Sequence, residues 1–226
     1  MLKEQFEKNK IGWKKSFLEG FSQDENGAAL PWMTYPAIEF LKNNLTKNHA
    51  VFEFGCGAST LFFAERVKKV VGLETNERWL GIVKEKLSND QWTPQQVRGD
   101  KLEVIVPSLS PRTPNLSPRT CCGVHYKNVE LHLMPDGLTN ISYENFPKNC
   151  GEKFDLIVVD SLKRFECVKN AIEALKPDGR IILDDSERKN YQKIFDFFAE
   201  KNFTKQDFFG IAPGQLRIKN TTIFYR

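Results

Sequence analysis

Apolar positions along this chain of 226 residues form two kinds of stretch. Short runs of consecutive or alternating apolar residues predict strands, and longer stretches with apolar residues at helical spacing predict helices. The predicted strands cover about 50–54, 70–74, 129–135, 154–160 and 180–183, and the predicted helices cover about 58–67, 77–87, 165–175 and 189–201. Because strands and helices alternate, we expect an α/β fold with a mostly parallel sheet and helices on both faces.

Both ends of the chain depart from this alternation. Residues 1–45 contain two amphipathic helical patterns and are predicted to form a helical N-terminal extension. Near the other end, residues 207–212 are followed by a turn at Pro213-Gly214 and by a last strand at 221–226. Two successive strands with a short link predict an antiparallel pair. The length fits one domain that spans 1–226.

The segment at about 90–127 interrupts the alternation. It contains a seven-residue unit almost twice, beginning with Leu-Ser-Pro-Arg-Thr at Leu109 and again at Leu116. Its prolines exclude a regular helix or a central strand, so we predict a solvated Pro/Ser-rich insertion. A phosphorylation or partner motif at the repeated Ser-Pro sites is the alternative interpretation.

Charge and hydropathy limit the possible partners. The formal net charge is +4, and the lysines and arginines are spread along the chain. This favours a solvated surface over a nucleic-acid interface. No apolar run approaches the roughly 20 residues that span a bilayer, and the first residues lack the apolar core of a signal peptide. We therefore expect a cytoplasmic protein with no membrane partner.

The stretch 51–60 reads VFEFGCGAST and predicts a strand, a tight glycine turn and a helix start. This is the first crossing of a nucleotide-binding α/β unit. At Gly55, Cys56 and Gly57 the backbone can approach a ligand, because a larger side chain would keep it away. Ser59 and Thr60 then begin a helix whose free N–H groups can receive a carboxylate.

Acidic residues follow the predicted strands. Glu53 lies two positions before the first glycine, which favours S-adenosylmethionine over a dinucleotide. Glu74 ends the second strand, where its two carboxylate oxygens can accept both hydroxyls of a ribose. Asp160 ends a later strand, at the edge where such sheets bind ligands. In NAD enzymes a third glycine allows close helix–strand packing, and here Thr60 stands in its place.

These motifs resemble those of class I S-adenosylmethionine-dependent methyltransferases. The chain closely resembles a poorly characterised bacterial group with a Pro-Trp…Tyr-Pro helix, an E-F-G-x-G-x-S-T-L turn and a terminal T-T-I-F. The resemblance implies a Rossmann-like sheet of seven strands with an antiparallel last strand. It also implies that Glu53 faces the amino-acid part of the cofactor.

Two acids are candidates for the adenine contact. Asp100 follows Val97-Arg98-Gly99, which resembles the third motif of the family, and Asp136 follows the predicted strand at 129–135. The stronger alternation of apolar residues favours the second alternative, and Asp136 is therefore the predicted contact.

A further resemblance concerns metal. Metal-dependent O-methyltransferases of the catechol type place an Asp, a Lys three residues later and an Asp-Asn pair where this chain has Asp160, Lys163, Asp184 and Asp185. The resemblance implies three oxygen ligands for Mg²⁺. It also implies that Lys163 is the base, with its pKa lowered by burial. Asp185 departs from the pattern, and Asp184-Asp185 also suits a helix N-cap, so a metal-free site is favoured.

Other side chains have two interpretations each. For Trp32 and Tyr35 the two alternatives are lining of the pocket for the cofactor or acceptor, and packing in the core. For Trp79, core packing is favoured. Arg164 pairs with an acidic acceptor or faces solvent.

The predicted function is methyl transfer from S-adenosylmethionine to a small-molecule acceptor, at a hydroxyl oxygen. A catalytically silent nucleotide-binding module and an NAD-linked oxidoreductase are the alternatives. Nucleic acid is excluded at this stage because the chain has neither an Asn-Pro-Pro-Tyr-type motif nor an evident basic stripe. The oligomeric state does not follow from the sequence.

Overall fold

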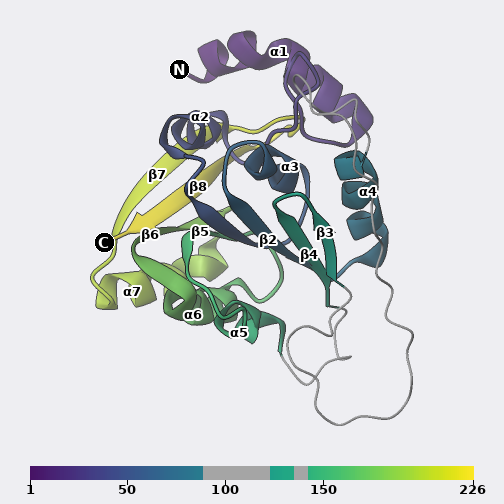
Figure 1. The fold of residues 1–226 in the computed structure, drawn as a ribbon. Coiled ribbons are helices and arrows are strands. Elements are labelled where there is room, and N and C mark those ends of the chain that lie inside the picture. Colours follow the sequence, from purple (N-terminus) through teal and green to yellow (C-terminus); the bar gives the residue numbers. More distant parts are fainter. Residues whose placement is uncertain (89–122, 135–141) are drawn as a thin grey trace.

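The computed structural model describes residues 1–88, 123–134 and 142–226. They contain one sheet with the strand order β3-β4-β2-β1-β5-β6-β8-β7 (Figure 1). The strands are β1 (Ala50–Phe54), β2 (Lys69–Glu74), β3 (Gly123–Tyr126), β4 (Val129–Leu133), β5 (Phe154–Val159), β6 (Leu175–Asp184), β7 (Thr204–Ile211) and β8 (Ile218–Tyr225). The helices are α1 (Leu2–Glu19), α2 (Tyr35–Asn44), α3 (Ala58–Ala64), α4 (Glu77–Ser88), α5 (Phe146–Asn149), α6 (Arg164–Ala174) and α7 (Gln192–Glu200), with short 3₁₀ turns at Tyr143–Asn145 and Lys189–Tyr191.

Seven of these strands form the predicted sheet. Strand β1 pairs in parallel with both β2 and β5, and β6 pairs in parallel with β5. Strand β8 runs antiparallel to both β6 and β7. These pairings confirm the mostly parallel sheet with an antiparallel last strand. They also confirm β4 as the third parallel strand, because it pairs with β2.

Strand β3 is an addition to the prediction. It pairs antiparallel with β4 and forms one edge of the sheet. Its four residues lie inside the range predicted for the insertion at about 90–127. The repeat at 109–120 lies outside the described residues, and its interpretation stays a prediction.

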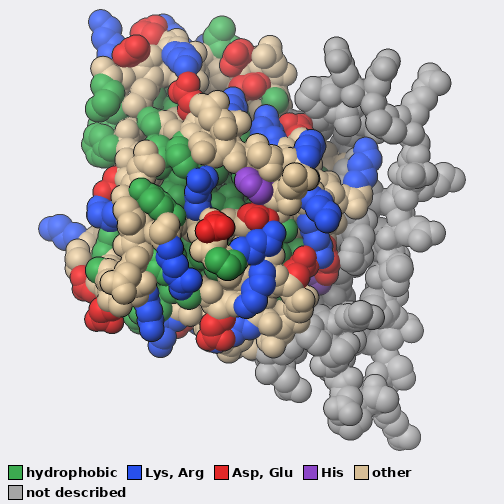
Figure 2. Space-filling model, turned by 60° about the vertical axis from the view of Figure 1, so that its left-hand side comes forward, with side chains coloured by type: hydrophobic (Ala, Val, Ile, Leu, Met, Phe, Trp, Pro, Cys, Tyr) green, Lys and Arg blue, Asp and Glu red, His purple; other side chains and the backbone are tan. Residues whose placement is uncertain are grey.

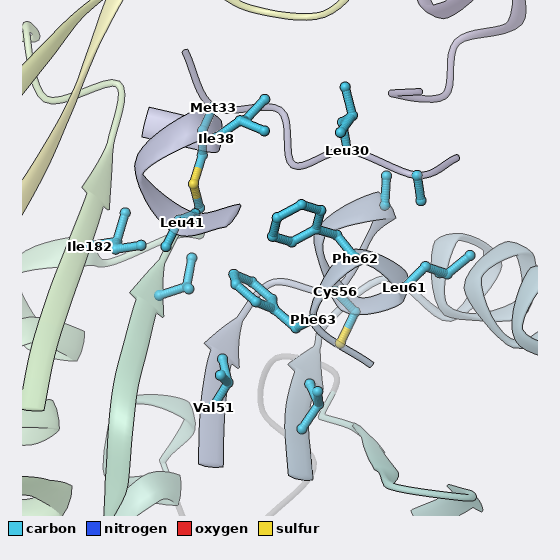
Figure 3. Close-up of a cluster of buried hydrophobic side chains, with 14 of the residues drawn as sticks. Leu30, Met33, Ile38, Leu41, Val51, Cys56, Leu61, Phe62, Phe63 and Ile182 are labelled. Carbon is cyan, nitrogen blue, oxygen red and sulfur yellow. The ribbon is translucent and has the colours of Figure 1, made fainter. Parts of the chain in front are cut away.

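Helices cover both faces of the sheet (Figure 1). On one face, side chains of α2, α3 and α4 form a hydrophobic cluster with Val51 of β1. Figure 3 shows Phe62 and Phe63 of α3 projecting toward α2 in this cluster. On the other face, α5, α6 and α7 pack against Phe52 and Phe54. The alternation along β1 therefore divides its side chains between two layers.

The N-terminal extension lies against the antiparallel end of the sheet. The Trp13 indole donates to the Gln215 carbonyl at 3.1 Å, and the Gln5 side chain accepts from the Ile211 amide at 3.3 Å. Helix α1 ends at Gly20, whose left-handed conformation (φ 63°) stops the helix. None of the helices in the described residues is long and apolar enough to cross a membrane.

Connectivity places a switch point at the centre of the sheet. From β1 the chain continues outward to β2 and β4 on one side, and β5 and β6 lie on the other side. The direction of winding therefore changes between β1 and β5. Ligands of open α/β sheets bind at the carboxyl ends of the strands at such a switch point.

Candidate functional site at the carboxyl edge of the sheet

The turn at residues 55–57, called the glycine turn below, follows β1 at the switch point. Gly55 has φ +93°, and a Cβ there would lie 2.5 Å from the Asp160 carbonyl oxygen. Its amide donates to the Leu73 carbonyl at 2.8 Å, while the Asp160 amide donates to the Phe54 carbonyl at 3.2 Å. A side chain at position 55 would therefore separate β1 from β5, which explains the glycine.

Gly57 has a different explanation. Its backbone is extended (φ −179°), so any residue can adopt its conformation. A Cβ at this position would meet the Trp79 ring at an ordinary contact distance of 3.7 Å. The described protein leaves room for a side chain here, and the space that a Cβ would fill is available to a ligand.

Thr60 closes the turn. Its hydroxyl accepts from the Gly57 amide at 3.0 Å, and its own amide donates to the Gly57 carbonyl at 3.1 Å. The prediction had Thr60 open a helix with free N–H groups, whereas one of these groups already has a partner. Ser59 is partly exposed beside it.

Glu53 carries a buried carboxyl group beneath the turn. The side chain is fully buried, and neither of its oxygens has a hydrogen-bond partner among the described residues. Burial raises the pKa of Glu53 from 4.5 to about 8. The hydroxyls of Ser59 and Thr60 offset this effect in part, although neither makes a well-formed hydrogen bond to the carboxyl group. Such an unpaired acid is costly unless a ligand supplies donors or a positive charge.

Glu74 connects the end of β2 to the glycine turn. Its carboxylate accepts from the Cys56 amide at 3.1 Å and from the amides of Thr75 and Asn76 at 2.8 Å. An ionised carboxylate offers about four acceptor positions, so room remains for a further donor. Glu74 therefore shapes the turn, and its predicted ribose contact stays a prediction.

One of two stacked tryptophans contacts the turn. The Trp79 indole donates to the Cys56 carbonyl at 2.6 Å, and its ring stacks on Trp32 with the centroids 6.0 Å apart. Trp79 packs against the core cluster, as favoured from the sequence, and it also contacts the turn, which was not predicted. Tyr35 is buried in the same core cluster, which confirms the core-packing alternative, and it also lines a cavity of about 420 Å³ between α1 and α2.

Three aspartates meet where β5 and β6 end. Asp160, Asp184 and Asp185, called the acid cluster below, each offer a carboxylate oxygen, and these atoms lie within 4.8 Å of one another. The sequence correctly predicted that they share this edge. Asp160 has an exposed side chain, whereas Asp184 and Asp185 are buried.

Basic side chains already pair with this acid cluster. Arg164 is buried and forms ion pairs with Asp160 and, at 3.8 Å, with Asp185. The ammonium of Lys219, which is 1% exposed, pairs with Asp184 and, at 2.7 Å, with Asp185. The side chain of Arg164 therefore does not face solvent, and its carboxylate partners are internal. Its pairing with an acidic acceptor stays a prediction.

The Mg²⁺ site that the resemblance to catechol-type enzymes implies, and that was not favoured from the sequence, does not fit these residues. Arg188 and Arg217 also pair with Asp185, so four basic side chains, counted with Arg164 and Lys219, surround three carboxylates. A divalent cation would have to compete with all of them for the same oxygens.

The proposed base has a different environment from the one predicted. Lys163 has a left-handed backbone (φ 51°) at the N-cap of α6, and its side chain is exposed. The base assignment rested on a buried lysine, and the structure does not bury this side chain.

Two acids were candidates for the adenine contact in the sequence. Asp100 and Asp136 both lie outside the described residues. The choice of β4 as the third strand is confirmed by its pairing with β2. Asp136 follows this strand in the sequence, and its contact with adenine stays a prediction.

No family model and no curated protein matches the sequence. Solved structures do match the fold. An rRNA methylase from Streptococcus thermophilus has a TM-score of 0.54 at 15% identity, over 84% of this chain and 96% of its own. A protein from Streptococcus mutans described as a methyltransferase, in complex with S-adenosylhomocysteine, has a TM-score of 0.52 at 17% identity, over 83% and 94%. An O-methyltransferase from Bacillus cereus, also in complex with S-adenosylhomocysteine, has a TM-score of 0.53 at 13% identity. The match covers 79% of this chain and 74% of that protein.

These similarities overturn the exclusion of nucleic acid made from the sequence. Structures described as rRNA methylases, one from Streptococcus thermophilus and one from Clostridium thermocellum, share the fold of this chain. Figure 2 shows basic and acidic side chains interspersed on one face, in agreement with a spread charge. Neither this distribution nor the lack of one base-pocket motif excludes an RNA acceptor, and a small-molecule acceptor is not established.

The sheet order, the reversed strand β8 and the glycine turn at the switch point agree with these similarities. At identities of 12–17% the similarities concern the fold alone. The chain has the fold of class I S-adenosylmethionine-dependent methyltransferases.

Proposed function

We propose that this chain transfers a methyl group from S-adenosylmethionine to an acceptor at the carboxyl edge of the sheet. The observation that carries the proposal is Glu53, a fully buried carboxyl group without a partner in the described residues, two residues before the glycine turn. A ligand with an ammonium group would supply both the charge and the donors that Glu53 lacks.

The residues around the turn suit the other parts of this cofactor. The extended backbone at Gly57 leaves space for the amino-acid moiety, and Glu74 retains an acceptor position for a ribose hydroxyl. When bound, S-adenosylmethionine supplies an electrophilic methyl carbon on a sulfonium centre. The protein's own contribution is to hold the two reactants at a reactive distance and orientation, from which most of the acceleration can come.

The acceptor side is proposed to lie near Asp160. This carboxylate is 41% exposed at the end of β5 and is oriented by Arg164, with which it forms an ion pair. A positioned carboxylate can accept the proton of a hydroxyl as the oxygen is methylated, so oxygen is the proposed acceptor atom. Lys163 lies three residues further on and is exposed, so it can contact an acceptor but is not preset as a base.

Calorimetric titration with S-adenosylhomocysteine tests the cofactor assignment. We expect binding in the micromolar range to the wild-type protein and no binding of NAD at the same concentrations. Binding of NAD instead would favour an oxidoreductase, and binding of neither ligand to folded protein would overturn the proposal.

A transfer assay tests the reaction itself. Methyl-labelled S-adenosylmethionine is incubated with the protein and either a panel of small hydroxyl compounds or total RNA, with Asp160→Asn as the matched variant. Label transfer that depends on Asp160 supports the proposal. Tight cofactor binding without transfer to any acceptor would favour the catalytically silent module.

A further inference from the structure

Among the described residues, Lys219 is the most deeply buried cation at the carboxyl edge. Its ammonium group has three N–H donors and faces three acceptors. These are the Trp32 carbonyl at 2.9 Å, a carboxylate oxygen of Asp184, and Asp185 Oδ1 at 2.7 Å. All three donors therefore have partners, and the charge lies between two carboxylates.

The other oxygens of Asp184 and Asp185 are also occupied. Asp184 Oδ1 accepts from the Thr221 hydroxyl at 2.8 Å. Asp185 Oδ1 accepts from Arg217 at 2.6 Å, and Asp185 Oδ2 pairs with Arg188. Each carboxylate oxygen of this buried pair has a donor from the protein, so a metal ion would have to compete with a donor at every one of these oxygens.

These positions are the ones at which the sequence resembles a metal site. The oxygens of Asp160, Asp184 and Asp185 lie close enough for one cation to bind all three. In the structure, a lysine from β8 brings the cation to the two buried aspartates. A Mg²⁺ ion requires near-octahedral oxygen ligands at about 2.0–2.1 Å, and it would have to displace the Lys219 ammonium from Asp184 and Asp185.

We propose that Lys219 is a built-in counter-cation that occupies the place between Asp184 and Asp185 which a divalent metal ion would take, and so closes the acid cluster to metal. The lysine makes this site permanent, because it belongs to the chain and does not depend on metal concentration. The proposal concerns metal binding by the protein alone and does not depend on methyl transfer.

Titration with Mn²⁺, followed by electron paramagnetic resonance, tests the proposal without cofactor or acceptor. We expect the wild-type protein to bind no Mn²⁺ at micromolar concentrations. Lys219→Met keeps a side chain of similar length without the charge, and we expect it to bind Mn²⁺ at least tenfold more tightly than the wild type. Lys205→Met, at an exposed lysine of β7 that pairs with Asp207, is the matched control and should leave Mn²⁺ binding unchanged.

Two results would overturn the proposal. One is micromolar, stoichiometric Mn²⁺ binding by the wild type that is lost in Asp185→Asn. The other is folded Lys219→Met with the same weak Mn²⁺ binding as the wild type. If Lys219→Met does not fold alone, it is refolded with Mn²⁺ and, separately, with K⁺. Recovery of the near-ultraviolet circular dichroism with Mn²⁺ but not with K⁺ supports the proposal. Recovery with neither cation contradicts it.

Discussion

At the scale of single residues, the unpaired carboxyl group of Glu53 is the clearest sign of a ligand. Burial raises its pKa from 4.5 to about 8, so the folded protein retains a proton at neutral pH that the unfolded chain has lost. Between these two values, the contribution of Glu53 to the free energy of unfolding falls as the pH rises. The fall amounts to about 1.4 kcal/mol for each pH unit and ends above pH 8.

Glu53→Gln removes this pH dependence, because glutamine does not ionise. We expect the variant to gain stability relative to the wild type as the pH is raised from 5.5 to 8.5. Urea unfolding of both proteins at the two pH values measures the difference. The control is Glu85→Gln, at an exposed site on α4, where no such change is expected. A difference between wild type and Glu53→Gln that is equal at both pH values would contradict the assigned pKa.

Glu74 makes a second prediction at this scale. Because its carboxylate is proposed to accept from the ribose, Glu74→Gln should weaken the binding of S-adenosylhomocysteine by roughly 1–3 kcal/mol. Glutamine retains one carbonyl oxygen for the amides of the turn, so the fold should persist. Calorimetry of Glu74→Gln is compared with that of Glu77→Gln, an exposed acid three residues later. Unchanged affinity in the folded Glu74 variant would remove the ribose assignment.

At the scale of elements, two glycines differ in the space around the position that the Cβ of an alanine would take. Gly55 has φ +93° and lies against the Asp160 carbonyl, whereas Gly81 lies in α4 with nothing within 4 Å of its Cβ position. We expect Gly55→Ala to destabilise the protein by roughly 1–3 kcal/mol. Gly81→Ala should stabilise it by about 0.5–1 kcal/mol, since alanine favours the helix.

Chemical denaturation of both variants measures these effects, and Gly81→Ala is the control for the change of glycine to alanine. Equal stability of Gly55→Ala and the wild type would mean that β1 and β5 can separate at the turn without cost. In that case the turn would not be the rigid element that the site requires.

Most elements could be predicted because their signals are local. Strands β1, β2 and β5 are apolar runs, and the acids Glu53 and Glu74 lie at or near their ends in the sequence. Strand β3 was missed because four residues at the edge of a sheet carry little pattern. Strand β6 begins at Leu175 and not at 180, since Leu175 already pairs with Phe154 before a bulge shifts the register. The turn signal at Pro177 and Gly179 obscured this start.

The basic partners of the acid cluster could not be predicted because no local pattern in the sequence indicates them. Lys219 lies in a polar stretch that looks solvated, and its partner Asp184 is 35 residues away in the sequence. Only the antiparallel pairing of β6 with β8 brings them together, with Asp184 opposite Thr221. The burial of Arg164 was missed for a similar reason: it depends on the side chains of Tyr191 and Asp160, which approach it in the folded state.

At the scale of the whole molecule, the sheet separates a ligand edge from an opposite edge. The carboxyl ends of β1, β2 and β5 carry Glu53, Glu74 and Asp160. The other ends of β1 and β5 border a hollow of about 260 Å³ that is lined by His49 and Asp155, among other residues. The proposed function uses only the carboxyl edge, so a bound cofactor should change the two edges differently.

Hydrogen exchange, read by mass spectrometry, can map this difference across the described residues. In the free protein we expect α1 to exchange by local opening at low free energy, because only Gly12 and Ser16 are buried among its 18 residues. Strands β1 and β5 should exchange slowest, since nearly all of their residues are buried.

Addition of S-adenosylhomocysteine should then slow exchange at residues 55–60, the glycine turn with the start of α3, and at residues 74–79, the end of β2 with the start of α4. A bound ligand stabilises the closed state of the segments that it contacts. Exchange around His49 and Asp155 should change little, and this hollow serves as the internal control. Slower exchange confined to the hollow would place the ligand at the wrong edge of the sheet. Equal slowing everywhere would report a rise in global stability and would leave the proposed contacts at the turn without support. Slowing confined to the turn and the end of β2 would connect the unpaired Glu53 to the ligand that it is proposed to bind.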